Sequence, residues 1–369
     1  MPFRDFLGNE PTVRHLRESL AAGRLPHSLI LAGPRGAGKY TLAIMLAQAA
    51  NCLAPPTPGP GTDGLPDFCG VCSNCTRIGQ ALDLDTRVDE AIAAREDLRD
   101  VDKRETRILI QTHPDVLVIP PDPPQLLIKI GQVRILTREI YRVPAEARRA
   151  ISIFTSAAFM KEAANALLKV LEEPPDHATI VLLAENIGEL LPTIRSRAGI
   201  FRLGAIPTEQ IEKLLGERRR DLKPAERPLI ARLAEGAIGR ALSFDLSAYL
   251  AARADALVLL RNAMGQSDAS DLFKVTETYR AGAEGQEKTE GLLRAAASIL
   301  EDLLLLKSET PQLVRNIDLQ RELASMATAV TFDWIEAAAR GLRQVESGMR
   351  RNLLRSLTLD SFAAQLSSS

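Results

Sequence analysis

The sequence predicts an α/β fold in which a parallel sheet carries a phosphate-binding loop and all-helical segments follow. Short apolar runs alternate with segments of helical periodicity, the pattern expected when helices cover both faces of a parallel sheet. The first apolar run, Ser28–Ala32, leads through a glycine-rich turn into a helical segment. From residue 248 to the end, the hydrophobic spacing is helical throughout.

The composition is that of an ordinary globular protein with room for two or three domains. The chain has 369 residues, of which 46% are apolar and 25% charged. A formal net charge of −1 disfavours nucleic-acid binding through bulk positive charge, so any DNA contact would come from a local patch. The N-terminus has no apolar signal core, and no run approaches the ~20 apolar residues of a membrane helix. We therefore expect a cytoplasmic location and no membrane contact.

The elements of the sheet follow one another in the first half of the chain. Val13, Leu16 and Leu20 lie at helical spacing and predict an amphipathic helix within residues 1–27. The expected strands are 28–32, 116–119, 150–154 and 179–184; the expected helices are 41–50 and 130–143, and 120–124 is an expected loop. Right-handed crossovers should connect the parallel strands.

The turn after the first strand, Gly33–Lys39, has the spacing of a phosphate-binding loop. Backbone N–H groups around Gly33, Gly36 and Gly38 would cradle phosphates at the positive end of a helix, and Lys39 would reach the β- and γ-phosphates. A chance glycine-rich turn is the alternative, which the flanking strand and helix disfavour.

The residue that follows the loop departs from the pattern of a magnesium site. A Ser or Thr hydroxyl normally holds Mg²⁺ there, whereas this chain has Tyr40. Its phenol lies too far from its own Cα for that role, and Thr41 points about 100° further around the helix. Whether ATP or ADP is still bound stays open.

All four cysteines form the pattern C-x16-C-x2-C-x2-C at Cys52, Cys69, Cys72 and Cys75. Free thiols or disulfides are the alternatives, and the missing signal peptide disfavours disulfides. Four soft ligands suit a tetrahedral Zn²⁺ site that leaves no position for water, so we expect a structural zinc ion. The Pro- and Gly-rich stretch 55–61 predicts an extended loop within this module.

Residues 76–112 are dense in charges of both signs, with isolated apolar residues among them. This composition predicts an inserted, solvated helix or hairpin. After residue 207, a small helical lid is expected, with helices near 208–218 and 224–233. Later helices are expected at 251–264, 270–279, 289–307, 320–327, 331–344 and 353–366, with breaks at Gly282–Gly285 and Ser308–Pro311.

The motif Asn165–Pro175, with the sequence NALLKVLEEPP, lies between two apolar strands and precedes Leu191–Arg197. Together with the phosphate loop, this order resembles the clamp-loader ATPases of the AAA+ class. The resemblance is specific for residues 1–243; beyond them only the helical character and Asn316–Asp318 are similar to the family's collar. It implies an AAA+ RecA-like phosphate-loop domain (1–203) with a zinc module (52–75) and the charged insertion (76–112), a helical lid (204–246) and an all-helical collar for oligomerisation (247–369).

The resemblance also shows what the chain lacks. In active relatives, an aspartate for Mg²⁺ and a glutamate for the attacking water end the strand before this motif. Phe154 and Thr155 stand at those positions. A threonine hydroxyl cannot act as a general base at neutral pH, because its pKa is far too high. We expect no intrinsic ATP hydrolysis.

Two arginines match family motifs that contact nucleotide. Arg240, in the sequence Gly-Arg-Ala-Leu, matches the lid arginine, with a surface ion pair as the alternative. Thr193–Arg197 resembles the family's Ser-Arg-Cys motif, with Ala198 in place of cysteine. The resemblance implies that Arg197 is an arginine finger that acts in trans on the ATP of a neighbouring subunit. An ion pair on a surface turn is the alternative.

These observations predict an ATPase-inactive stator of a clamp-loader ring. Its partners would be γ/τ and δ subunits and, through the complex, the sliding clamp and primer-template DNA. One alternative is an active γ/τ-like motor ATPase, which Tyr40, Phe154 and Thr155 disfavour. The other is an AAA+ scaffold module outside replication.

Overall fold

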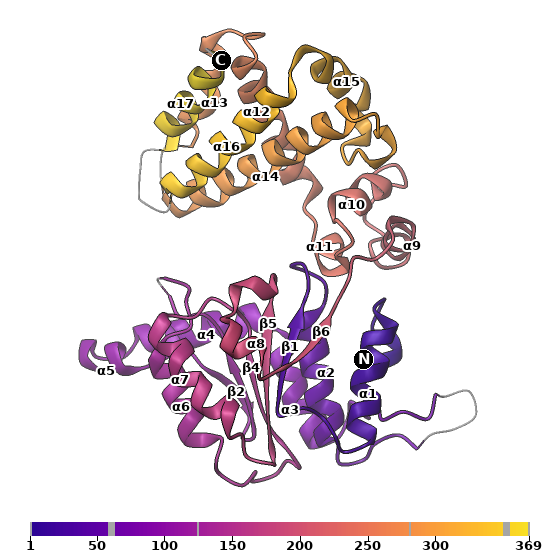
Figure 1. Ribbon diagram of the computed structural model, residues 1–369, viewed down its shortest axis with the longest axis vertical. Helices are drawn as coiled ribbons and strands as arrows, with labels where there is room; N and C mark the ends of the chain where they lie inside the picture. Colours follow the sequence, from indigo (N-terminus) through magenta and orange to yellow (C-terminus); the bar gives the residue numbers. More distant parts are fainter. Residues whose placement is uncertain (1, 58–62, 124, 280–281, 350–354, 368–369) are drawn as a thin grey trace. The chain divides into compact units, whose positions relative to one another are not determined.

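The computed structural model describes residues 2–57, 63–123, 125–279, 282–349 and 355–367 (Figure 1). The chain forms two compact units, 1–207 with 236–240 and 208–235 with 241–369. The lid expected at 204–246 is thus shared between the two units, and the division into three domains stays a prediction. Residues 58–61 of the expected zinc-module loop and Pro124 of the expected 120–124 loop lie outside the described residues.

Six strands among the described residues form one sheet in the order β2-β3-β4-β5-β1-β6. They are β1 (Ser28–Ala32), β2 (Ile110–His113), β3 (Val116–Ile119), β4 (Ala150–Phe154), β5 (Ala178–Ala184) and β6 (Gly199–Arg202). All neighbours pair in parallel except β2, which runs antiparallel to β3 at the edge. The predicted parallel sheet is confirmed, and β2 and β6 extend it. Because parallel strands end at the same edge, the segments after β1, β4 and β5 meet there.

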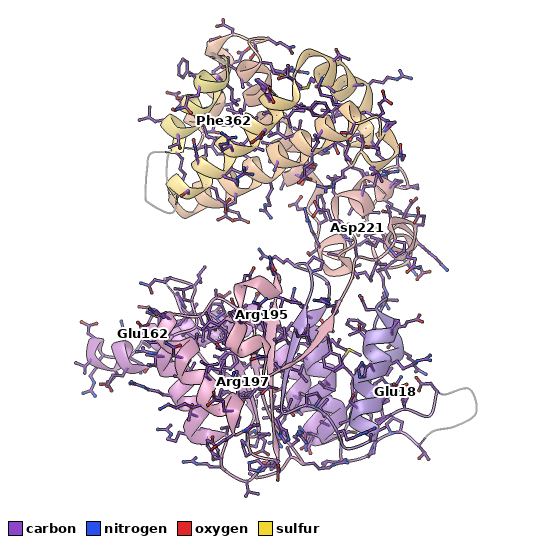
Figure 2. The ribbon with its side chains drawn as sticks, viewed as in Figure 1. Glu18, Glu162, Arg195, Arg197, Asp221 and Phe362 are labelled. Atoms are coloured by element: carbon purple, nitrogen blue, oxygen red, sulfur yellow. The ribbon has the colours of Figure 1, made fainter. Side chains whose placement is uncertain are left out.

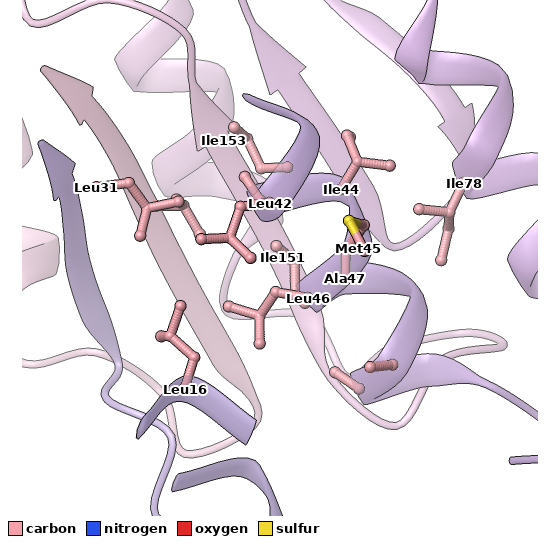
Figure 3. Packing of buried hydrophobic residues seen from close by; sticks show 14 of the residues in the cluster. Leu16, Leu31, Leu42, Ile44, Met45, Leu46, Ala47, Ile78, Ile151 and Ile153 are labelled. Atoms are coloured by element: carbon pink, nitrogen blue, oxygen red, sulfur yellow. The ribbon is translucent and has the colours of Figure 1, made fainter. Parts of the chain in front are cut away.

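The sheet is buried on both faces. The helices of this unit are α1 (Glu10–Ala21), α2 (Lys39–Asn51), α3 (Ser73–Gly79), α4 (Leu84–Glu96), α5 (Asp100–Glu105), α6 (Ile130–Glu139), α7 (Lys161–Glu172) and α8 (Pro192–Arg195), with short 3-10 turns η1 (Phe3–Asp5), η2 (Gln80–Leu82) and η3 (Ile187–Glu189). Leu29 and Leu31 of β1 pack with α1–α3, whereas Ile30 and Ala32 pack with α6 and α7. Figure 3 shows Leu42 and Leu46 of α2 near Ile151 of β4.

Helix α6 ends at Glu139, so the expected extension to Val143 is wrong. Val143 precedes Pro144, and the residue before a proline is pushed out of the helical region. The chain turns here instead and presents the backbone N–H groups of residues 145–147 to the carboxylate of Asp115, at 2.7–2.8 Å. This turn ties the segment before β4 to the start of β3.

The charged insertion, residues 76–112, is mainly helical, which is one of the two forms that its composition predicts. Helix α4 has no buried residue and α5 follows it, while Ile110–His113 joins the sheet as β2. Arg95 anchors α4 through an ion pair of 2.6 Å to Asp122, which is fully buried. Lys129 lies 3.6 Å from the same carboxylate.

The described residues of the second unit form helices joined by loops, without a strand. Its helices are α9 (Thr208–Arg218), α10 (Arg227–Leu233), α12 (Leu246–Ala263), α13 (Ala269–Glu277), α14 (Gly282–Lys307), α15 (Gln320–Ala329), α16 (Phe332–Met349) and α17 (Arg355–Ser367). The residues of short α11 (Ile238–Leu242) are divided between the two units, up to Arg240 in the first and from Ala241 in the second. The break expected at Gly282–Gly285 is wrong, because α14 begins at Gly282. Gly285 lets Arg355 approach: a Cβ there would lie 2.9 Å from the Arg355 Nη1. No helix among the described residues is long and apolar enough to span a membrane.

Candidate functional site

The phosphate-loop sequence forms the turn between β1 and α2. Gly36 and Gly38 have φ of +81° and +85°, a left-handed backbone that favours glycine. Gly33 donates its N–H to the Ala184 carbonyl at the end of β5, at 3.1 Å. The Lys39 ammonium folds over the loop and donates to the carbonyls of Gly33 at 2.5 Å and Pro34 at 2.8 Å. The structure therefore brings the predicted loop residues together around one cation.

Acidic side chains lie beside this cation. Burial lowers the pKa of Lys39, and repulsion from Arg35 acts in the same direction. Attraction to Glu185 and Glu189 opposes the change. Both residues follow β5, next to the phosphate loop. A negative charge here would repel a nucleotide phosphate.

Tyr40 does not place its hydroxyl where a magnesium ligand would lie. Its phenol donates to the carbonyl of Ala81 in η2 at 2.5 Å, and the ring packs against the hydrophobic core around α2. Burial raises the pKa of this phenol, so it stays a neutral donor. Thr41 follows it along α2, and its contribution to nucleotide binding stays a prediction.

The carboxyl end of β4 is built as hydrophobic core. Phe154 is fully buried, and its ring centroid lies 5.2 Å from that of Phe159. The Thr155 N–H donates to Ile119 of β3 at 3.1 Å, and the Ser156 hydroxyl accepts from the backbone of Ala158 at 3.0 Å. Backbone pairing and apolar packing thus occupy the place where active relatives carry two carboxylates.

The tip of the phosphate loop contacts α11. Gly239 donates its N–H to the Gly36 carbonyl at 2.8 Å. A Cβ on Gly36 would lie 2.7 Å from the Arg240 nitrogen, so only glycine permits this approach. The backbone of Arg240 is therefore held at the loop, and contact of its guanidinium with nucleotide stays a prediction.

The four cysteines gather at the C-terminal end of α2, with every Sγ within 4.8 Å of the others. Backbone N–H groups of Cys69, Cys72 and Cys75 point at the sulfurs of Cys52, Cys69 and Cys72 at 3.3–3.5 Å. A tetrahedral ion with Zn–S bonds of about 2.3 Å needs sulfurs about 3.8 Å apart, so this cluster could hold a metal ion with little adjustment.

The thiols do not share one environment. Burial acts to raise the pKa of Cys72, but hydrogen bonds from the backbone N–H groups of Cys75 and Leu53 outweigh it and lower that pKa to about 6. Burial raises the pKa of Cys52 and of Cys75. Metal binding would draw all four thiols into the thiolate form.

Polar contacts fix this cysteine module to α2 and to the segment before β4. Gln48 donates to the Cys75 carbonyl at 2.8 Å, and Asn74 donates to the Asn51 carbonyl at 3.1 Å. Arg148 donates to the Cys52 carbonyl. These contacts could not be predicted from the sequence, because Gln48, Asn74 and Arg148 are not part of any spaced motif. These contacts tie the C-terminal half of α2 to the module, while Tyr40 at its first turn bonds to Ala81 in η2.

Arg197 lies just after α8, exposed and in contact with its own chain (Figure 2). Its Nη2 is 2.8 Å from the Glu172 Oε1 at the end of α7, and its Nη1 donates to the Thr193 carbonyl at 3.0 Å. Sequence reasoning missed Glu172 as its partner, because the pair spans two elements. An exposed arginine at this corner suits either an ion pair or a contact with another subunit.

Comparison with known proteins identifies the family. A family model described as DNA polymerase III, delta subunit matches residues 8–207, more than half of the chain. The chain belongs to this family. It shares 31% identity over 246 residues with the DNA polymerase III subunit tau of Escherichia coli strain K12, covering 65% of this chain and 32% of that protein. The subunit gamma/tau of Mycobacterium tuberculosis strain H37Rv is 28% identical over 284 residues, 76% of this chain and 42% of its own.

The chain thus spans less than half the length of these curated relatives. A solved structure of a gamma-subunit-related protein of DNA polymerase III from Thermotoga maritima aligns with 97% of this chain and 99% of its own, at 18% identity and a TM-score of 0.43. The family match and the tau and gamma/tau relatives make the chain a member of the clamp-loader AAA+ proteins of DNA polymerase III.

Proposed function

We propose that this chain is a δ′-type clamp-loader subunit, a stator that hydrolyses no ATP of its own. The observation that carries the proposal is Phe154, fully buried at the carboxyl end of β4. An aspartate for Mg²⁺ and a glutamate for water would have to stand there and at Thr155. The phenol of Tyr40, bonded to Ala81, supports the same conclusion from the other side of the site.

Such a subunit would contribute to hydrolysis at the ATP site of a neighbouring subunit. In a ring with γ/τ and δ subunits, Arg197 would reach the ATP bound next door and stabilise charge on its γ-phosphate. The exposure of this side chain is consistent with that role. The assembled ring would then load the sliding clamp onto primer-template DNA, in the cytoplasm, as part of the DNA polymerase III holoenzyme.

The cysteine module would bind one structural Zn²⁺. Cys52, Cys69, Cys72 and Cys75 would hold it in a closed site without a water position. Bound zinc would supply no chemistry to ATP; it would fix the loop between α2 and α3. Gly33, Gly36, Gly38, Lys39, Thr41 and Arg240 would form a degenerate nucleotide site, in which ATP or ADP, if held, would not turn over.

A γ/τ-like motor ATPase is the second candidate. It is favoured by the tau and gamma/tau names of the relatives and by Lys39 at the phosphate loop. A steady-state ATPase assay of the isolated chain, with Lys39→Ala as the control, distinguishes the two functions. For a stator, we expect the wild-type chain and Lys39→Ala to show equal ATP turnover. Turnover above the control that Lys39→Ala abolishes would favour the motor. A scaffold outside replication would instead show no incorporation into a γ/τ–δ ring.

A further inference from the structure

Arg197 is held by its own chain through both terminal nitrogens of its guanidinium. Nη2 lies 2.8 Å from the Glu172 carboxylate. Nη1 donates to the Thr193 carbonyl at 3.0 Å and to the Ser196 hydroxyl at 3.3 Å. The side chain of Arg197 keeps 35% of its surface exposed, and that of Glu172 keeps 50%. The group is therefore reachable from solvent and paired within its own chain.

The end of α7 determines where the carboxylate lies. Glu172 is the last residue of the helix, and Glu173 leaves the helical region with φ −129° and ψ 65°. Pro174 enforces this exit, because the residue before a proline avoids the helical conformation. Glu172 therefore stands at the negative end of the α7 dipole, where a guanidinium is favoured in addition to the direct pair.

A carboxylate and a phosphate compete for the same guanidinium. Both are oxyanions that arginine binds through paired N–H groups. A phosphate that approached Arg197 while Glu172 remained paired would meet a negative charge a few ångströms away. Release of Glu172 would therefore favour a trans contact of Arg197 with nucleotide.

We propose that Glu172 is a positioning residue for Arg197: it holds the guanidinium against the α7–α8 corner until a neighbouring subunit offers a phosphate in exchange. This inference rests on the proposed function for the identity of the incoming anion. The pairing itself is a property of the isolated chain. The two parts can therefore be tested separately.

The first test uses the isolated full-length chain. Phenylglyoxal modification of Arg197, followed by peptide mass spectrometry, reports how often the guanidinium is free, with Arg195 as the reference in the same segment. An exposed ion pair is worth ~0.2–1 kcal/mol, so Glu172→Gln should raise the rate about 1.4- to 5-fold. Glu173→Gln is the matched control and should leave the rate unchanged. Equal modification rates of Arg197 in the Glu172→Gln and Glu173→Gln variants would overturn the proposed role of Glu172.

The second test uses rings reconstituted with γ/τ and δ subunits. Glu172→Gln should lower the concentration of this chain needed for half-maximal ATPase stimulation, by a similar factor, and Glu173→Gln should not. The shift must vanish when Arg197→Ala is also present, which a general change in folding would not produce. If Arg197→Ala alone leaves ring activity intact, the proposed function fails, while the pairing of Arg197 with Glu172 in the isolated chain is unaffected. If Arg197→Ala impairs the ring and the two glutamine variants behave alike, the role of Glu172 fails.

Discussion

Restoring the missing aspartate at the end of β4 should unfold this site rather than revive it. Phe154 is fully buried, lies opposite Leu182 of β5 and Ile119 of β3, and packs against Phe159. Phe154→Asp would remove this packing and place a carboxylate in the cavity. We expect a large loss of stability and no gain in ATPase activity.

The magnitude follows from two contributions. Removing a buried phenylalanine down to the size of alanine costs ~3–5 kcal/mol. Burying an unpaired carboxylate adds a penalty of several kcal/mol, or forces the group to take up a proton. The packing loss alone should lower the melting temperature by about 6–20 °C, at roughly 2–4 °C per kcal/mol for a unit of about 200 residues.

Differential scanning calorimetry of the full chain would measure this change, with ATPase turnover read on the same samples. Phe154→Leu keeps an apolar side chain and should cost much less. Thr155→Glu adds a carboxylate at a half-buried neighbouring position and should leave the fold intact. A Phe154→Asp protein with an unchanged melting temperature would refute the view that apolar packing has replaced the acid site.

Three further predictions concern the cysteine module, the first turn of α2 and the turn before β4. Metal analysis of protein purified without added zinc should find about one Zn²⁺ per chain, whereas a metal-free, folded protein with four titratable thiols would exclude the site. Tyr40→Phe leaves the Ala81 carbonyl without its donor and should cost ~1–3 kcal/mol in urea unfolding; an unchanged midpoint would mean that water replaces the phenol. Although burial acts to raise it, backbone N–H groups of Glu146, Ala145 and Ala147 hold the pKa of Asp115 below its usual value. The ionised Asp115 carboxylate therefore stabilises the folded protein above about pH 4, and this contribution is lost as the pH falls through the lower pKa of the folded state. Asp115→Asn should therefore make the free energy of unfolding less dependent on pH in the acid range.

The local hydrophobic pattern was enough to predict the central strands of the sheet but not the strands at its edges. The buried strands β1 and β5 are continuous apolar runs bounded by turns, and such runs predict parallel strands directly. Strand β2 mixes buried and exposed positions within a charged segment. Its pairing with β3 depends on a partner, which sequence spacing does not reveal.

Helix boundaries failed where tertiary contacts overrule propensity. Gly282–Gly285 has the composition of a break, yet α14 begins there, and Arg355 Nη1 lies 2.9 Å from where a Cβ on Gly285 would stand. Val143 continues the apolar pattern of α6, but Pro144 and the Asp115 carboxylate redirect the backbone. Neither boundary can be predicted from its own segment, because the contacts that accompany it come from distant parts of the chain.

The candidate site was predictable in its parts and not in its connections. The glycines, Lys39 and the four cysteines carry fixed spacings, so the sequence located them. The links between them run through Tyr40 to Ala81 and through Gln48 to Cys75. Glu172, the partner of Arg197, was named only as part of a motif. These contacts join residues far apart in the chain, and the fold alone brings them together.

The central claim is that this chain contributes an arginine to a neighbour's ATP site and no hydrolysis of its own. The most direct measurement is the clamp- and DNA-stimulated ATPase of reconstituted rings that contain wild-type, Arg197→Ala or Arg195→Ala chain. Arginine fingers in GTPases are worth ~10³–10⁵ in rate, and the loss here should be smaller because other subunits keep their own fingers. The melting temperature of isolated Arg197→Ala should stay nearly unchanged, since an exposed ion pair contributes ~0–1 kcal/mol. We predict that Arg197→Ala rings lose stimulated ATPase and Arg195→Ala rings keep it; equal activity of Arg197→Ala and wild-type rings would contradict the account.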